Sequence, residues 1–134
     1  KLYFGVAARM PREASGEIVQ WLVKDETRNV VSVMHEGASG AQRSVTRWKV
    51  VGARDGLVHL DLEPLTGRAH QLRVAAASLG APLLGDLKYG AERALPDKSI
   101  ALHAAELEVE HPTLREPRVL RCAPPPRDWW ALRR

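Results

Sequence analysis

The residues with the clearest chemical potential lie in one short segment near the middle of the chain. Residues 64–74 have the sequence PLTGRAHQLRV, which predicts the start of a helix. The free N–H groups and the dipole at a helix N-terminus favour anions. Four side chains of this segment could contact a phosphate, a carboxylate or a base edge: Arg68, His70, Gln71 and Arg73. The same residues also fit an alternative without a binding function, a capped helix with solvated polar side chains.

Most common catalytic and cofactor patterns are missing from the sequence. It contains no Walker A sequence, no G-x-G-x-x-G, no H-E-x-x-H and no C-x-x-C. The five histidines lack metal-ligand spacing with one another, and Ser39 lies outside the G-x-S-x-G pattern of serine hydrolases. The single cysteine, Cys122, excludes an internal disulfide and a four-cysteine zinc site. The sequence therefore predicts no metal site.

Length and composition fit one globular domain. The chain has 134 residues, of which 45% are apolar and 27% charged, and no apolar run approaches the ~20 residues that span a bilayer. The formal net charge is +4, and the excess of basic residues lies entirely between residues 115 and 134. Arginine outnumbers lysine and suits bidentate phosphate contacts. Composition alone leaves two interpretations open, an anionic partner or an Arg-rich solvated surface.

Hydrophobic periodicity predicts an α+β domain with a largely antiparallel sheet and one prominent helix. Within the stretch Leu57 to Glu63, alternate residues fall on opposite faces, so we expect a half-buried strand with His59 on its polar face. Residues 52–56 are expected to form the preceding hairpin loop. The predicted strands are residues 1–8, 18–23, 30–34, 44–51, 57–63, 100–110 and 118–122.

The helix is expected to run from about Ala69 to Leu79, with Thr66 as its N-terminal cap. Gly80 fits the left-handed position after the last turn, and Pro82 prevents continuation. Residues 128–132 are expected to form a terminal helical turn.

The central segment and the residues after it resemble the hallmark motifs of the RluA family of RNA pseudouridine synthases. Those motifs are TGR-x-HQ(L/I)RV and G-x-P-(L/I)-x-GD-x-x-YG. The residues that carry the resemblance are Thr66-Gly67-Arg68, His70-Gln71-Leu72-Arg73-Val74, Leu79-Gly80, Pro82, Gly85-Asp86 and Tyr89-Gly90. Weaker similarities, such as Lys1-Leu2-Tyr3 to the K-x-Y motif and residues 100–104 to IALHA, extend it over almost the whole chain.

The resemblance implies a pseudouridine synthase fold, a mixed, mostly antiparallel sheet with flanking helices around an RNA cleft. It also implies an activity on ribosomal or transfer RNA, in which a uridine is cut at its N-glycosidic bond and the uracil is rejoined through C5. An aspartate carboxylate is essential in that family, and neither a metal nor an organic cofactor is required. The target nucleotide must leave its stack to be reached.

Two catalytic residues are implied by position. Arg73 matches the arginine that pairs with the catalytic carboxylate, and Tyr3 matches the tyrosine that stacks on the uracil and assists at C5. Asp86 is expected to be a structural hydrogen-bond acceptor. Four further residues in or near the same motifs are candidate RNA contacts: Arg68, His70, Gln71 and Lys88.

The sequence departs from the family pattern at one essential point. The catalytic aspartate of the family lies in an R-L-D-x-x-T-S-G motif before the K-x-Y strand, and residues 1–134 contain no such motif. We therefore expect a single domain that is the C-terminal portion of a catalytic domain, inactive alone, with the aspartate before Lys1. An alternative is a non-catalytic RNA-binding module that keeps the fold. The sequence also departs from the family pattern at Ala69 and Ala75, where relatives often carry threonine and histidine, so the resemblance implies no substrate contact at these two positions.

Two expectations concern the state of the chain in the cell. A sheet severed at its first strand would expose an unpaired edge, which predicts association or partial disorder near Lys1. The lack of cysteine pairs is compatible with a reducing cytoplasm, and an organelle is the alternative. No membrane partner is expected.

Overall fold

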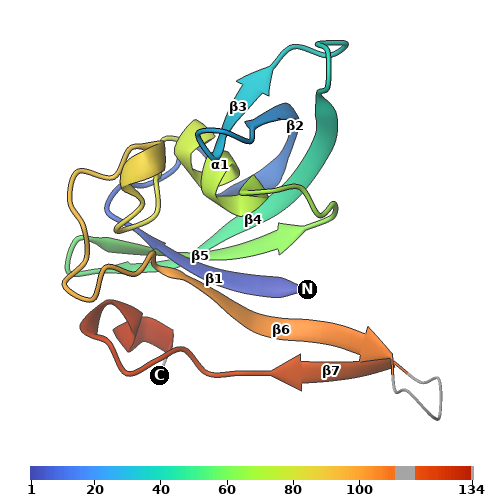
Figure 1. Cartoon of the computed structure of the whole chain (residues 1–134). Helices are drawn as coiled ribbons and strands as arrows, with labels where there is room; N and C mark the ends of the chain where they lie inside the picture. The colour runs from blue at the N-terminus through green and yellow to red at the C-terminus, as the bar shows by residue number, and fades with distance from the viewer. Residues whose placement is uncertain (111–116, 134) are drawn as a thin grey trace.

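The computed structural model describes residues 1–110 and 117–133, which form one seven-stranded sheet with a helix packed against it (Figure 1). The strand order is β3-β2-β4-β5-β1-β6-β7, and the pairings between these strands are antiparallel. The strands are β1 (Leu2–Ala7), β2 (Ser15–Asp25), β3 (Val30–Met34), β4 (Gln42–Arg54), β5 (Leu57–Pro64), β6 (Leu102–Glu110) and β7 (Pro117–Arg121). The helices are α1 (Gln71–Ser78) and the 3-10 helices η1 (Leu87–Tyr89) and η2 (Asp128–Arg133).

The predicted fold class is confirmed in its main feature, the mostly antiparallel sheet, and each predicted strand overlaps an observed one. The resemblance implied flanking helices around the sheet. Among the described residues, the helices are only α1 and the two 3-10 helices. None of the described helices has the length and apolar character needed to cross a membrane.

The hairpin between β4 and β5 is tighter than expected. Asp55 and Gly56 form a two-residue turn with φ angles of 53° and 77°, the positive pair that type I′ hairpin turns require. β4 continues to Arg54 because a bulge between Val50 and Gly52 absorbs one residue. The predicted loop over residues 52–56 is therefore wrong in length, since three of its residues belong to the strand.

The first strand lies inside the sheet rather than at its edge. β1 pairs with β5 on one side and with β6 on the other, while β3 and β7 are the outer strands (Figure 1). The expectation of an unpaired edge at the start of the chain is wrong, because backbone groups of β6 already satisfy the second side of β1. Tyr3, near the start of β1, is thereby held in register opposite Leu62 of β5.

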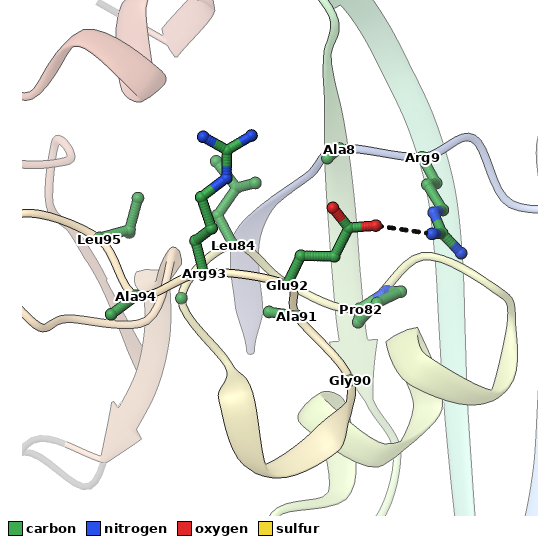
Figure 2. Close-up of a pocket in the computed structure, with 11 residues that line it drawn as sticks. Ala8, Arg9, Pro82, Leu84, Gly90, Ala91, Glu92, Arg93, Ala94 and Leu95 are labelled. Atoms are coloured by element: carbon green, nitrogen blue, oxygen red, sulfur yellow. Dashed lines mark hydrogen bonds and ion pairs between the residues drawn. The ribbon is translucent and has the colours of Figure 1, made fainter.

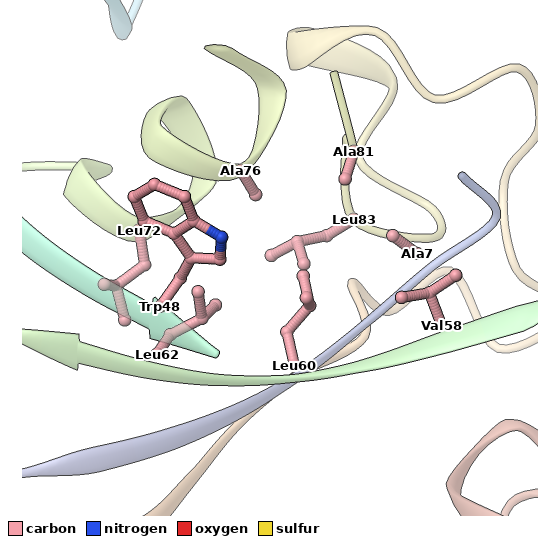
Figure 3. Close-up of a cluster of buried hydrophobic side chains, with 9 residues drawn as sticks. All are labelled: Ala7, Trp48, Val58, Leu60, Leu62, Leu72, Ala76, Ala81 and Leu83. Atoms are coloured by element: carbon pink, nitrogen blue, oxygen red, sulfur yellow. The ribbon is translucent and has the colours of Figure 1, made fainter. Parts of the chain in front are cut away.

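The principal core lies between α1 and the sheet. Trp48 of β4 and Leu60 and Leu62 of β5 pack against Leu72 and Ala76 of the helix (Figure 3). Both leucines of β5 have no exposed surface, and burying such a side chain contributes about 1.5–3 kcal/mol. This core fixes the helix, and with it the segment that precedes the helix, against the centre of the sheet.

The opposite face of the sheet is covered near β1 by the C-terminal segment. Val6 packs in a second cluster with Ala101 and with Trp130 of η2. His59 pairs with Val6 across the β1–β5 ladder and so shares this face, where it is only 2% exposed. The prediction of a half-buried strand is therefore wrong at His59, because the C-terminal segment packs over the face expected to be solvated.

The helix begins two residues later than predicted and without the expected cap. His70 occupies the N-cap position with a left-handed φ of 52° and makes no side-chain capping hydrogen bond. The Thr66 hydroxyl instead accepts a hydrogen bond from the Val45 N–H at 3.0 Å and donates one to Gln71 Oε1 at 2.7 Å. Thr66 therefore ties the loop to β4, which is a different role from capping. Gly80 has a φ of 82° at the other end, as predicted.

Candidate active site

A pocket of about 370 Å³ lies where the start of β1, the end of β5 and the first turn of α1 meet. Lys1 and Leu102 also line it, so β6 contributes to its wall. Five of the six residues with a predicted role line this pocket: Tyr3, Arg68, His70, Gln71 and Arg73. The sequence prediction that these distant residues act together is thus compatible with their placement.

The guanidinium of Arg73 is held by the carboxylate of Asp86. Arg73 Nε donates to Oδ2 at 3.0 Å and Nη2 donates to Oδ1 at 2.7 Å, a bidentate charge-assisted pair. The Asp86 side chain is fully buried and that of Arg73 is 19% exposed. The hydrogen bonds that Arg73 donates to Asp86 raise the pKa of Arg73 above its ordinary value. Asp86 is an acceptor, as the sequence suggests, but its partner is the candidate catalytic arginine.

Tyr89 packs against the face of the same guanidinium, whereas Asp86 binds its edge. Its ring centre lies 4.9 Å from Arg73 Cζ, a cation–π contact. The Tyr89 hydroxyl accepts a hydrogen bond from the Val31 N–H at 2.9 Å and lies 2.6 Å from His70 Nδ1. Sequence reasoning assigned Tyr89 no role, although its position in the G-D-x-x-Y-G motif was a usable signal.

His70 occupies a positively charged environment. Partial burial lowers the pKa of His70, and the nearby charges of Arg73, Lys88 and Lys24 lower it further. The imidazole is therefore neutral at pH 7, and we infer that its Nδ1 accepts the hydrogen bond of the Tyr89 hydroxyl. This assignment leaves Nε2 as the protonated nitrogen.

Gln71 is 3% exposed, and its amide is fully used inside the protein. The Nε2 group donates to the Val45 carbonyl at 2.8 Å and to the Thr46 hydroxyl at 3.0 Å. The Oε1 atom accepts from the Thr66 hydroxyl and from the Arg68 N–H. Because an amide has two donors and two lone pairs, no capacity remains for RNA. Gln71 thus positions the loop that carries Arg68.

The two remaining candidate contacts are more exposed. Arg68 Nε donates to the Arg43 carbonyl at 2.9 Å, which leaves the rest of its guanidinium at the pocket. Lys88 lies outside the lining of the pocket, where its Nζ donates to the Asn29 carbonyl at 2.7 Å. Its charge still acts on the site through the pKa of His70.

A second pocket, of about 440 Å³, lies at the other end of β1 (Figure 2). Ala8 and Arg9 line it from the end of β1, opposite residues of the segment 82–95. An ion pair joins Arg9 Nη2 to Glu92 Oε1 at 3.0 Å, with both side chains largely exposed. No residue with a predicted role lines this pocket. Across the described ranges, no group of three His, Cys, Asp or Glu side chains is arranged to hold a metal ion.

The C-terminal arginines do not form a free basic patch where their side chains are described. Arg121 pairs with Glu106 at 2.8 Å and Arg127 pairs with Asp97 at 3.1 Å. The others have side chains outside the described residues: Arg115, Arg118, Arg133 and Arg134. In the pocket at the start of α1, the described positive charge comes from Lys1, Arg68 and Arg73, and none of it from the C-terminal segment.

The fold matches solved structures of one enzyme class. Human RNA Pseudouridylate Synthase Domain Containing 1 aligns with a TM-score of 0.71 and 30% identity, over 93% of this chain and 54% of that chain. Human RNA Pseudouridylate Synthase Domain Containing 4 has the same TM-score at 23% identity, which shows a shared fold.

The family model for RNA pseudouridylate synthase matches residues 1–78, and the chain belongs to this family, in its RluA branch. The uncharacterized RNA pseudouridine synthase YhcT of Bacillus subtilis is 37% identical over 121 residues, 87% of this chain and 38% of that protein. The dual-specificity RNA pseudouridine synthase RluA of Vibrio cholerae is 44% identical over 70 residues, 52% of this chain and 29% of that protein. The chain therefore spans well under half the length of these relatives.

Proposed function

We propose that this chain is the C-terminal portion of the catalytic domain of an enzyme that isomerises uridine to pseudouridine in RNA. Family membership supports the class of reaction. The observation that carries the proposal is the meeting of Tyr3 and Arg73 in one pocket, although they come from the first strand and the only described α-helix. The essential aspartate is proposed to precede Lys1, since residues 1–134 contain no R-L-D-x-x-T-S-G motif.

Each residue at the pocket has a role that its chemistry fits. Arg73 orients and stabilises the reacting carboxylate through charge-assisted hydrogen bonds, and Tyr3 offers an aromatic face to the flipped uracil. Arg68 and His70 supply hydrogen-bond donors to the nucleotide, and Lys88 contributes positive charge beside it. Gln71 acts indirectly, by holding Arg68 in place. None of these steps requires a metal or an organic cofactor.

The proposed substrate is ribosomal or transfer RNA. A relative from Rickettsia conorii is named a ribosomal large subunit pseudouridine synthase, and the Vibrio cholerae relative is named dual-specificity. We place the whole protein in the cytoplasm, with an organelle as the alternative, since a rice relative is named mitochondrial.

The test uses the longest natural polypeptide that contains residues 1–134 and RNA tritiated at uridine C5. We expect tritium release, because forming the C5 bond displaces the C5 hydrogen. Arg73→Ala is expected to abolish release, a loss of at least about 10³-fold. Arg121→Ala, which removes an exposed arginine paired with Glu106, is the matched control and retains activity. Full activity in Arg73→Ala would overturn the role assigned to Arg73.

The alternative is an RNA-binding module without catalysis, which the lack of an R-L-D motif in residues 1–134 favours. Such a protein binds RNA with an affinity that falls steeply with salt, because phosphate contacts release counterions. It releases no tritium under any condition. The same preparation and the same RNA therefore separate the two functions.

A further inference from the structure

We propose that Asp86 and Tyr89 are positioning residues for Arg73. Together they fix the plane of its guanidinium, and the Asp86 carboxylate balances its positive charge, so Arg73 presents oriented N–H groups to the pocket rather than an unpaired cation. This inference rests on the proposed function and assigns to the second motif, Gly85-Asp86 with Tyr89, a part in the same reaction.

Asp86 fixes the edge of the guanidinium. Its two oxygens engage Nε and Nη2 at 3.0 and 2.7 Å, and such a two-point contact restricts rotation of the planar group. The carboxylate has no exposed surface, so it has little freedom to move to another partner. Nη1 of Arg73 makes no hydrogen bond within the described part of the chain, and Arg73 lines the pocket that contains Tyr3.

Tyr89 restricts the face of the guanidinium. Its ring lies 4.9 Å from Arg73 Cζ and packs against the buried cluster of Leu22, Val31 and Val74. The hydroxyl is anchored to the Val31 N–H of β3 and to His70. The hydroxyl is therefore tied to both β3 and the start of α1, while the ring packs against the buried cluster.

A short segment carries both positioning side chains at the required spacing. Gly85 has a φ of 79°, and a Cβ at this position would collide with the Ser99 carbonyl oxygen, so only glycine fits the turn. The Asp86 carbonyl then accepts hydrogen bonds from the N–H groups of Tyr89 and Ala91 at 3.2 and 3.0 Å. This one turn directs Asp86 to the edge, and Tyr89 to the face, of the same guanidinium.

Because Asp86 balances the charge of Arg73, removing Asp86 changes the charge beside the pocket, an effect that a purely structural residue would not have. Tyr89 acts directly on Arg73, and the charges of Lys24 and Lys88 act on His70 beside it. Along the pocket, the other charged or titratable groups are Lys1, Tyr3 and Arg68. Among the groups named here, Asp86 is the acid, and most of the others are basic. Its removal leaves an additional positive charge beside a pocket proposed to bind RNA, which strengthens phosphate attraction. The same change releases the guanidinium, which slows the reaction.

The test compares Asp86→Asn with the wild type in the full natural polypeptide. We expect kcat for tritium release to fall about 10²-fold, the order of loss that misplacement of a reacting group causes. In the same variant, the affinity for a fluorescein-labelled oligouridine is expected to be unchanged or higher at low salt. Asp97→Asn is the matched control, because Asp97 also pairs with an arginine, Arg127 at 3.1 Å, away from this pocket. It changes neither quantity.

Two results would overturn the inference. One is an unchanged kcat in Asp86→Asn. The other is a proportional loss of kcat, RNA affinity and folded fraction, which a purely structural role predicts. If Asp86→Asn does not fold, the Arg73 guanidinium signals of the wild type are measured by ¹⁵N NMR. Restricted rotation supports the inference, and free rotation overturns it.

The proposed function fails separately from this inference. A wild-type polypeptide that binds RNA but releases no tritium contradicts the enzymatic function. In that case the direction of the affinity change in Asp86→Asn and the rotation of the guanidinium still decide whether Asp86 orients and neutralises Arg73.

Discussion

Two pockets lie at opposite ends of β1, and each is lined by an arginine that pairs with a carboxylate. The pairs have similar lengths, 2.7 Å for Arg73–Asp86 and 3.0 Å for Arg9–Glu92. Their surroundings differ, because the side chains are 19% and 0% exposed in the first pair and 67% and 75% exposed in the second. Burial makes the first pair a fixed element of the structure, whereas water screens the second.

The proposed site lies in the smaller of these two pockets. The larger pocket contains no residue with a predicted role, and its ion pair is solvated. The segment that includes Leu84 and Gly85 lines the larger pocket, and the next residue, Asp86, pairs with Arg73 of the smaller one. One side of this segment therefore lines the larger pocket, and its next residue holds the proposed catalytic arginine.

Of the changes that distinguish the two ion pairs, Asp86→Ala is expected to have the largest effect on stability. This change leaves Arg73 partly buried without its partner, and breaking a buried pair in this way costs about 3–5 kcal/mol of unfolding free energy. Urea denaturation followed by circular dichroism measures the loss, with Glu92→Ala as the matched control. A loss equal to that of the control would show that the two pairs are energetically alike.

The sequence predicted the strands and the helix around this site better than the contacts between them. Alternation in β5 correctly placed Leu60 and Leu62 in the core, because strand periodicity is a local property. The burial of His59 was not predictable in this way, since His59 lies on the same face of the sheet as Val6, which packs with Trp130 from the far end of the chain. The start of α1 was also missed, because Thr66 bonds to β4 instead of capping the helix.

The pairing of Arg73 with Asp86 was also not predictable from local sequence patterns. The motif identified Arg73 as a residue that holds a carboxylate, and it identified Asp86 as an acceptor. Their contact depends on the positive φ of Gly85, which turns the chain back towards α1, and no periodicity reports such a turn. The role of Tyr89 depends on the same turn.

A smaller effect is expected from Tyr89→Phe, which keeps the ring against Arg73 and removes only the hydroxyl. The Val31 N–H and His70 Nδ1 then lose their partner, and each unsatisfied buried group costs about 1–3 kcal/mol. Because the site is only partly buried, we expect a total loss near the lower value. Thermal unfolding measures it, and kcat should change far less than in Asp86→Asn. An equal loss of kcat would mean that the hydroxyl acts in the reaction itself.

The pH dependence of stability is expected to distinguish the smaller pocket from the larger one. The pKa of His70 is lowered in the folded protein, by burial first and then by neighbouring positive charges. The unfolded state therefore binds the proton more readily, and stability falls as the pH drops below about 6.5, the unperturbed pKa. His70→Gln should reduce this acid destabilisation in urea titrations between about pH 5 and 8. An unchanged slope in the variant would contradict the assignment.

The smallest effect is expected at the larger pocket. A double-mutant cycle with Arg9→Ala and Glu92→Ala should give a coupling energy of about 0–1 kcal/mol, because both side chains are exposed and solvent screens their attraction. The coupling should weaken further in high salt, since mobile ions screen exposed charges. Tritium release by the full polypeptide should stay at the wild-type rate in both single variants. A coupling as large as that of Arg73 and Asp86 would mean that burial is not what distinguishes the two pairs. A loss of tritium release would mean that this end of β1 takes part in the reaction.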